Sequence, residues 1–258
     1  MLRRSRSIPV LLLVIPFLVT LACGGSQPKA GEPAAQQAPP TKPVTELTKD
    51  MHERLGRVTV IQHAVIRGDL EAAAEPAKWI VDQQDTAGFP AESAKYITDM
   101  KKFAANVAAA KDVPAAATST AMMISYCGAC HSAAKVTLTL TELPKPVGLK
   151  GPALHMREHE WAIDQMYRGL TSPSEDLWKK GVEALKEAPM AAKDLPKDAG
   201  LTKEVMASET KIHEQAEKAL KTTDMGSKVA LYGEVLKECA TCHSLHGRVW
   251  GPGLGKAK

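Results

Sequence analysis

Apolar residues recur through most of the chain at the three- and four-residue spacing of amphipathic helices. The first stripe, which is interrupted by Gln62, consists of Met51, Leu55, Val58 and Val65. A matching stripe later in the chain consists of Met156, Ile163, Tyr167 and Leu170. Strand-like alternation occurs only in residues 136–141, which can equally form an extended linker. The pattern therefore predicts an all-α fold.

Glycine and proline positions indicate where these helices begin and end. Gly68 follows the first stripe and is expected to end its helix, with Asp69 capping the next one. Proline is tolerated in the first turn of a helix, and three prolines stand near expected helix starts: Pro90, Pro114 and Pro152. Pro76 lies inside the second predicted helix and should kink or delay it.

The pentapeptide Cys-x-x-Cys-His occurs twice. Residues 127–131 read Cys-Gly-Ala-Cys-His, and residues 239–243, 112 positions later, read Cys-Ala-Thr-Cys-His. In each half, the motif follows the same order of an amphipathic helix, a second helix, a loop and a third helix. This order predicts an internal duplication, with a first domain over residues 46–135, a linker over 136–152 and a second domain over 153–258.

The motif has the spacing that attaches a c-type haem. Two cysteines three apart form thioether bonds to the porphyrin, and the histidine that follows binds the iron. The two copies use four of the five cysteines in the chain. The sequence therefore predicts two covalently attached haems. The expected thioether anchors are Cys127, Cys130, Cys239 and Cys242, and the expected proximal iron ligands are His131 and His243.

Three other uses of these cysteines fit the sequence less well than haem attachment. A thioredoxin-like dithiol needs a preceding strand and a βαβ frame, which the pattern lacks. A Cys₄ zinc site usually has its two cysteine pairs about 12 to 20 residues apart, and it gives no reason for the histidines. A disulfide between cysteines three apart in a helix is strained, because the side chains diverge.

The amino terminus has the pattern of an export signal. Residues 1–22 contain three early arginines, an apolar run and a small-residue end, and the run is too short and too interrupted by Pro16 to span a membrane permanently. Cys23 follows in a lipobox-like context, which predicts a lipidated residue. Residues 23–45 are rich in Gly, Pro, Ala and Gln and are expected to form a flexible tether. The expected location is the bacterial periplasm, with the protein anchored to a membrane as a lipoprotein.

Net charge gives no indication of nucleic-acid binding. The chain has 33 Lys and Arg against 29 Asp and Glu, a formal charge of +4. Removal of the predicted signal deletes three arginines and no acid, which leaves about +1. Because the lysines are scattered among acidic residues on helix faces, they are expected to be solvated.

A haem motif at the carboxyl end of a four-helix segment resembles the class II c-type cytochromes, the cytochrome c prime group. The resemblance covers residues 46–132 and 153–250, with its specificity in the two motifs. It implies two tandem four-helix bundles with up-down-up-down helices, and in dimers of this family such bundles pair between chains. The opposing feature is residues 239–255, which look like the opening of a class I cytochrome, although only 15 residues follow His243.

The resemblance also implies distal ligands for the irons. Low-spin members of the family use a methionine from the first helix, and Met51 and Met156 occupy that helix at matched positions. A methionine on an apolar stripe is ordinarily core filler, so this alternative stays open. His159, one turn after Met156, is the rival ligand in the second half, and its counterpart Arg54 cannot bind iron.

Two functions fit these expectations. Ligands on both sides of each iron would make the protein an electron carrier between periplasmic or membrane redox partners, without turnover of a substrate. An open sixth position would instead make it a protein that binds or senses NO or CO. A di-haem peroxidase is less favoured, because no set of polar acid–base residues accompanies either motif. Three other histidines are expected on the surface: His52, His63 and His213.

Overall fold

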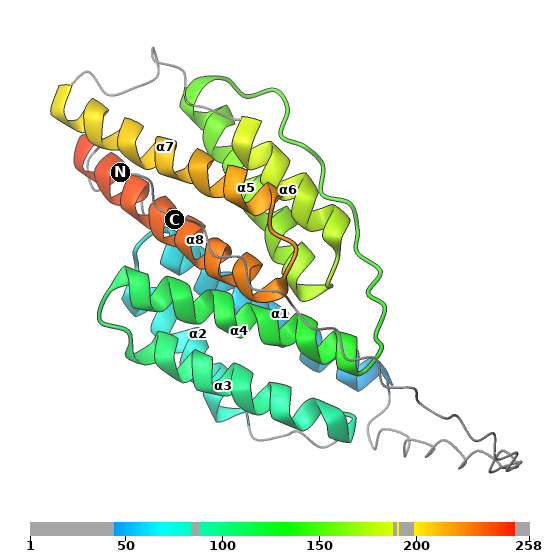
Figure 1. The fold of residues 1–258 in the computed structure, drawn as a ribbon. Helices are drawn as coiled ribbons and strands as arrows, with labels where there is room; N and C mark the ends of the chain where they lie inside the picture. Colours follow the sequence, from blue (N-terminus) through cyan, green and yellow to red (C-terminus); the bar gives the residue numbers. More distant parts are fainter. Residues whose placement is uncertain (1–43, 84–87, 188–189, 191–198, 251–258) are drawn as a thin grey trace, which may run out of the picture. The chain divides into compact units, whose positions relative to one another are not determined.

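The computed structural model describes residues 44–83, 88–187, 190 and 199–250, and the regular elements among them are helices (Figure 1). They are α1 (Val44–Ile66), α2 (Leu70–Asp82), the short 3₁₀ helix η1 (Ala91–Ser93), α3 (Ala94–Ala109), α4 (Val113–Ala133), α5 (Gly151–Thr171), α6 (Glu175–Glu187), α7 (Ala199–Leu220) and α8 (Met225–Trp250). No strand occurs in this described part, so the all-α prediction is confirmed.

Helices that follow one another in the chain pack side by side. In the first half, α1 packs on α2, α2 on α3 and α3 on α4, and α1 also contacts α4. In the second half, the same succession runs from α5 to α8. The two halves meet mainly where α4 packs on α8, and α1 contacts α8 as well (Figure 1). The two helices that carry the Cys-x-x-Cys-His motifs are therefore neighbours.

The junction between α1 and α2 follows the sequence prediction. Gly68 has a φ of +71° and donates from its backbone N–H to Val65 O at 2.9 Å, while Asp69 donates to Ala64 O at 2.9 Å. This pair of bonds is a Schellman motif, which glycine favours because it tolerates a positive φ. Asp69 then caps α2, since its Oδ1 accepts from Ala72 N at 2.9 Å.

The prolines confirm three helix starts and correct one expectation. Pro114 and Pro152 lie in the first turns of α4 and α5, and Pro90 directly precedes η1. The expected delay of α2 at Pro76 is wrong, because that helix runs from Leu70 through the buried proline to Asp82. The cap at Asp69 fixes the start of α2 independently of Pro76.

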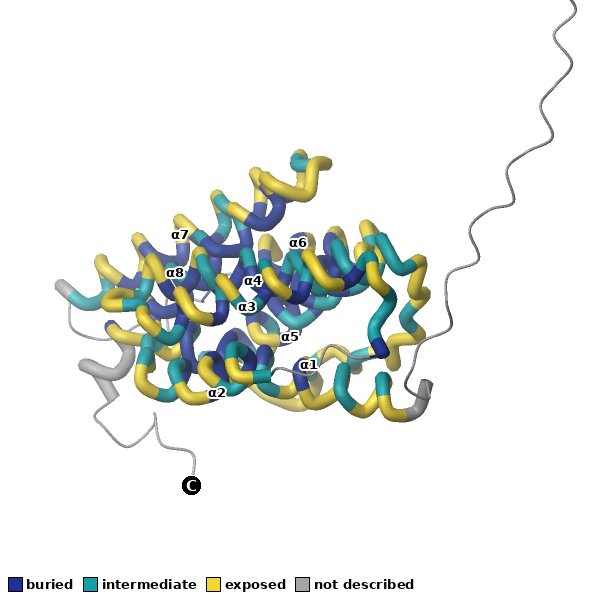
Figure 2. Tube along the Cα trace, turned by 90° about the horizontal axis from the view of Figure 1, so that it is seen from below, coloured by how far each residue is buried: buried dark blue, intermediate teal, exposed yellow. Residues whose placement is uncertain are grey.

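One hydrophobic cluster contains residues of both halves. It extends from Val58 of α1 to Cys239 of α8, and Figure 2 shows buried segments along helices of both halves. Within it, the Tyr232 hydroxyl donates to Gln62 Oε1 at 3.0 Å, and both side chains are buried. The first predicted stripe is wrong at Leu55, which is 43% exposed. The stripe is buried from Val58 onward, Gln62 included, and because α1 is covered by α2, α4 and α8 its buried face is wider than the stripe and also contains Ile61.

The connection between α4 and α5 packs against the second half. Residues 136–150 form neither helix nor strand. Trp161 of α5 donates from Nε1 to Leu143 O at 3.0 Å, and Lys180 of α6 pairs with Glu142 at 3.0 Å. The β-prone run is thus an irregular linker.

In the described part of the chain, no helix has the length and apolar character needed to cross a membrane. The predicted signal, Cys23 and residues 23–43 of the predicted tether lie outside the described residues.

Candidate functional site

The first Cys-x-x-Cys-His motif lies at the carboxyl end of α4. Asp112 caps the start of this helix by accepting a hydrogen bond from Ala115 N at 2.8 Å. The helix continues through the motif, so Cys127 and Cys130, three positions apart, lie on neighbouring positions of one face. Both cysteines are half-buried.

His131 is oriented by the end of α5. Its Nδ1 lies 2.8 Å from Thr171 O. Because a carbonyl oxygen only accepts hydrogen bonds, Nδ1 carries the proton in this bond, and Nε2 has the free lone pair that a metal ligand needs. Gly128 permits this approach, since a Cβ at that position would lie 2.0 Å from Leu170 O.

A buried cation lies near the first motif. Arg54 of α1 is 5% exposed, its guanidinium lies 5.8 Å from the centre of the Phe89 ring, and its charge influences the Cys127 thiol. Met51, the candidate distal ligand, is half-buried one turn earlier in α1. Arg54 occupies the position in the first half that corresponds to His159 in the second half, and it places a positive charge there.

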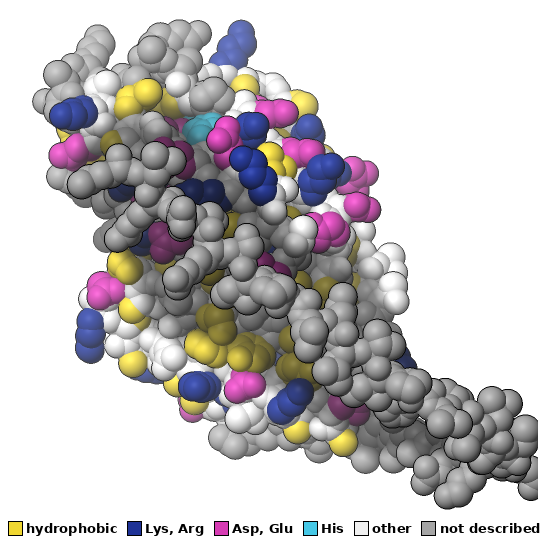
Figure 3. All heavy atoms as spheres, in the orientation of Figure 1, with side chains coloured by type: hydrophobic (Ala, Val, Ile, Leu, Met, Phe, Trp, Pro, Cys, Tyr) yellow, Lys and Arg dark blue, Asp and Glu magenta, His cyan; other side chains and the backbone are white. Residues whose placement is uncertain are grey.

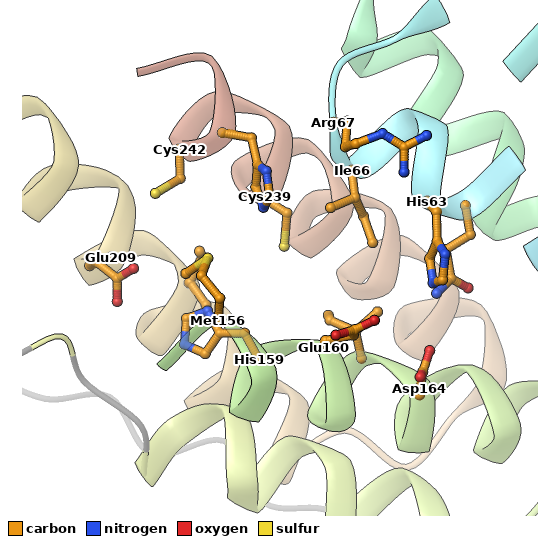
Figure 4. Close-up of a pocket in the computed structure, with 14 residues that line it drawn as sticks. His63, Ile66, Arg67, Met156, His159, Glu160, Asp164, Glu209, Cys239 and Cys242 are labelled. Carbon is orange, nitrogen blue, oxygen red and sulfur yellow. The ribbon is translucent and has the colours of Figure 1, made fainter. Parts of the chain in front are cut away.

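The second motif lies in α8 beside a cavity of about 240 Å³. Cys239 and Cys242 are buried, whereas His243 is exposed. Figure 4 shows the two cysteines across the cavity from Met156 and His159 of α5. All the residues that the sequence assigned to the second site line this one cavity: Met156, His159, Cys239, Cys242 and His243. The structure thus brings together residues from two helices about 80 positions apart in the chain.

The thiols are not activated as nucleophiles. Burial raises the pKa of Cys127, Cys239 and Cys242 to about 12, and burial also raises the pKa of Cys130. A redox dithiol needs a lowered thiol pKa, so this environment argues against the thioredoxin-like alternative. Among the described residues, the group of potential metal ligands contains no cysteine, which argues against a Cys₄ zinc site.

A second cluster of polar side chains adjoins the same cavity. His155 and His159, one turn apart on α5, meet Glu209 of α7, and all three are buried. His155 Nε2 lies 3.0 Å from Glu209 Oε1, and the two imidazole rings of α5 lie 4.1 Å apart between centres. His213, one turn after Glu209, lies 3.7 Å from Glu209 Oε2. Only His159 of this cluster was identified as a functional candidate from the sequence.

The charges in this cluster are mutually stabilised. Burial opposes ionisation of Glu209, but the hydrogen bond from His155 and the nearby His213 ring outweigh it and lower the pKa of this carboxyl to about 2. In turn, the nearby Glu209 carboxylate raises the pKa of His213. The expected surface position is correct for His52, which is exposed, whereas His213 and His63 are half-buried and His63 lines the cavity.

Comparison with known proteins found no matching family model, no matching curated protein and no matching solved structure.

Proposed function

We propose that this chain is a di-haem c-type cytochrome that carries single electrons. In this proposal, α1–α4 and α5–α8 are two four-helix bundles of the class II cytochrome type, each with a haem motif in its last helix. The observation that carries it is the cavity beside α8, where Cys239, Cys242 and His243 meet Met156. Two thiols, an imidazole and a thioether are the donors that a covalently bound, six-coordinate haem requires.

The side chains at this cavity include the donors that a haem needs, but the cavity volume is small for a porphyrin. The cavity is partly open to solvent, and apolar and thiol side chains such as Ile163, Ile212 and Cys239 line it together with polar and charged ones. Its volume of about 240 Å³ is below the roughly 300–1,000 Å³ of typical small-molecule sites. A porphyrin therefore needs the side chains at the open mouth to move aside, and one haem edge would stay exposed. An exposed edge is where an electron enters or leaves.

The first site has its own support. The hydrogen bond from His131 Nδ1 to Thr171 O holds the ring as the tautomer that binds iron through Nε2. Cys127 and Cys130 would anchor that haem, and Met51 is the proposed distal ligand. A bound haem would supply an iron that cycles between the ferrous and ferric states.

Met156 is the better distal candidate in the second half. It lines the cavity and packs against the apolar cluster that contains Cys242 and Leu245. His159 is held in the cluster with His155 and Glu209. Ligands on both faces of an iron leave no open position, which favours electron transfer over binding of NO or CO.

The charges near the two motifs predict different potentials. In the first motif, buried Arg54 influences Cys127 and half-buried Glu92 influences Cys130, whereas the buried acids Glu209 and Glu238 influence the second motif. A positive charge favours the reduced iron and a negative charge favours the oxidised iron. We therefore expect the first haem to have the higher potential, and Arg54→Gln to lower that potential alone. A redox titration that resolves a single potential would contradict this expectation.

The proposed setting follows from residues 1–45. We propose export, lipidation at Cys23, and a membrane-tethered position in the bacterial periplasm. The partners would be redox proteins that dock at an exposed haem edge, and no nucleic acid is expected. Figure 3 shows basic and acidic side chains intermixed on the face it presents, without a large patch of one sign among the residues it colours. Pairing of bundles between two chains remains part of the proposal.

The test is the optical spectrum of the full chain, produced with a c-type haem attachment system. The oxidised and reduced protein is examined before and after carbon monoxide is added. We expect low-spin spectra that the gas leaves unchanged. Met156→Leu should open one iron and produce a component that shifts with carbon monoxide, whereas Met206→Leu, at a 43% exposed methionine, should not. A wild-type protein that binds the gas would favour the gas-binding function.

A further inference from the structure

The buried histidines beside the second motif form a cluster that haem attachment does not use. His155, His159 and Glu209 are 5%, 7% and 4% exposed, respectively. One potential ligand atom from each lies within 4.8 Å of the other two. Ligands of a tetrahedral zinc ion, bound at about 2.0–2.1 Å, lie roughly 3.3 Å apart, so small side-chain movements would close this set around an ion.

We propose that His155, His159 and Glu209 bind a divalent transition-metal ion of the zinc class, at a site that borders the cavity proposed for the second haem. Two imidazole nitrogens and one carboxylate are typical ligands of Zn²⁺. Mg²⁺ and Ca²⁺ prefer oxygen ligands, so this donor set discriminates against them. Zinc has no redox chemistry of its own, and the ion would therefore fix α5 against α7 without accepting electrons.

The local structure presents these donors together. His155 and His159 are four residues apart on α5, which puts both rings on the face that meets α7. On α7, Glu209 and His213 have the same spacing. Nδ1 of His155 is buried and has no hydrogen-bond partner among the described residues. A buried nitrogen of this kind is costly unless a ligand occupies it.

His213 lies next to the second oxygen of the Glu209 carboxylate, Oε2, whereas His155 bonds to Oε1. Its Nδ1 lies 2.8 Å from Lys186 O, so this nitrogen donates to the carbonyl and Nε2 is directed to Glu209 Oε2 at 3.7 Å. Partners of this kind fix the orientation of a ligating carboxylate in metal sites. His213 is thus a positioning residue in the proposed site.

The proposal assigns His159 to the ion and leaves Met156 to the second haem. Both side chains line the cavity beside Cys239 (Figure 4). The first half lacks the site, because the positions that match His155 and His159 are Asp50 and Arg54. The inference does not depend on haem attachment, and it concerns the second half only.

The test uses the full haem-loaded chain, equilibrated with Zn²⁺ and then dialysed into metal-free buffer. Elemental analysis should find one zinc per chain in the wild type and in His52→Gln, which alters an exposed histidine. His155→Gln and Glu209→Gln should retain none, and His213→Gln should bind about tenfold more weakly. Zinc retained equally by all variants, or absent from the wild type, would overturn the proposal. Haem content, measured on the same samples by absorbance, reports separately on the proposed function.

Two measurements on the wild type keep the test decisive if a variant fails to fold. Zn²⁺ should raise the thermal midpoint, and Mg²⁺ at the same concentration should not. X-ray absorption at the zinc edge should show nitrogen and oxygen ligands alone. Sulfur among the ligands would place the ion at a cysteine motif and would overturn the assignment, as would the absence of a zinc-dependent thermal shift.

Discussion

The hydrogen bond between Tyr232 and Gln62 offers a direct test of how the two halves are joined. Tyr232 lies on α8 and Gln62 on α1, and both side chains are at most 1% exposed. Tyr232→Phe removes the donor and leaves Gln62 Oε1 buried, at 3.0 Å from where the hydroxyl was. An unsatisfied buried acceptor costs about 1–3 kcal/mol. For a protein of this size, each kcal/mol corresponds to about 2–4 °C in the thermal midpoint, so a loss of several degrees is expected.

The assay is thermal and denaturant unfolding of the haem-loaded protein, followed by circular dichroism and haem absorbance. Because one hydrophobic cluster includes both halves, both probes should report a single transition that Tyr232→Phe moves as a whole. Tyr96→Phe, at a half-buried tyrosine of α3, is the control and should change stability by less than about 0.5 kcal/mol. Adding Gln62→Leu to Tyr232→Phe should recover part of the loss. Two separate transitions, or a neutral Tyr232→Phe, would refute the shared core.

Three further changes have defined outcomes. Gly128→Ala places a Cβ against Leu170 O and should cost about 1–3 kcal/mol and disturb the first haem spectrum, which melting and absorbance would detect. Lys135→Gly should stabilise by about 0.5–1 kcal/mol in denaturant unfolding, because φ at this position is +53°. The pKa of Glu209, lowered to about 2 from 4.5 by its histidine partners, contributes stability that is complete above pH 4.5 and lost towards pH 2. The thermal midpoints of Glu209→Gln and the wild type should therefore converge as the pH falls over that range. A constant difference between the two midpoints would contradict the negative charge assigned to Glu209.

The local rules of helix formation allowed much of the fold to be predicted from the sequence. The end of α1 at Gly68, the cap at Asp69 and the starts at Pro114 and Pro152 each depend on residues close in the chain. The hydrogen-bond partner of Gln62 could not be predicted in this way. That partner is Tyr232 of α8, which is 170 positions further along the chain. Hydrophobic periodicity places Gln62 on the buried stripe of its helix, but it does not reveal which distant side chain bonds to the amide there.

The candidate site, like the fold, could be predicted from the sequence only in part. The spacing of the cysteines and histidines is local, and it led to both motifs directly. The cluster of His155 and Glu209 joins helices 54 positions apart, and only the packing of α5 on the other helices brings these residues together. A signal was present in the sequence, since two pairs of potential ligands recur at a spacing of four. Such pairs are also common on solvated helix faces, so their spacing alone does not identify a metal site.

Covalent attachment of haem at both motifs is tested most directly by the mass of the purified, exported protein after acid extraction of non-covalent haem. We expect a mass increase equal to two haems. The double variant Cys127→Ala and Cys130→Ala, and the matching variant Cys239→Ala and Cys242→Ala, should each retain one haem. A wild-type chain that loses all its haem on extraction, or variants that retain the full wild-type increase, would contradict the account.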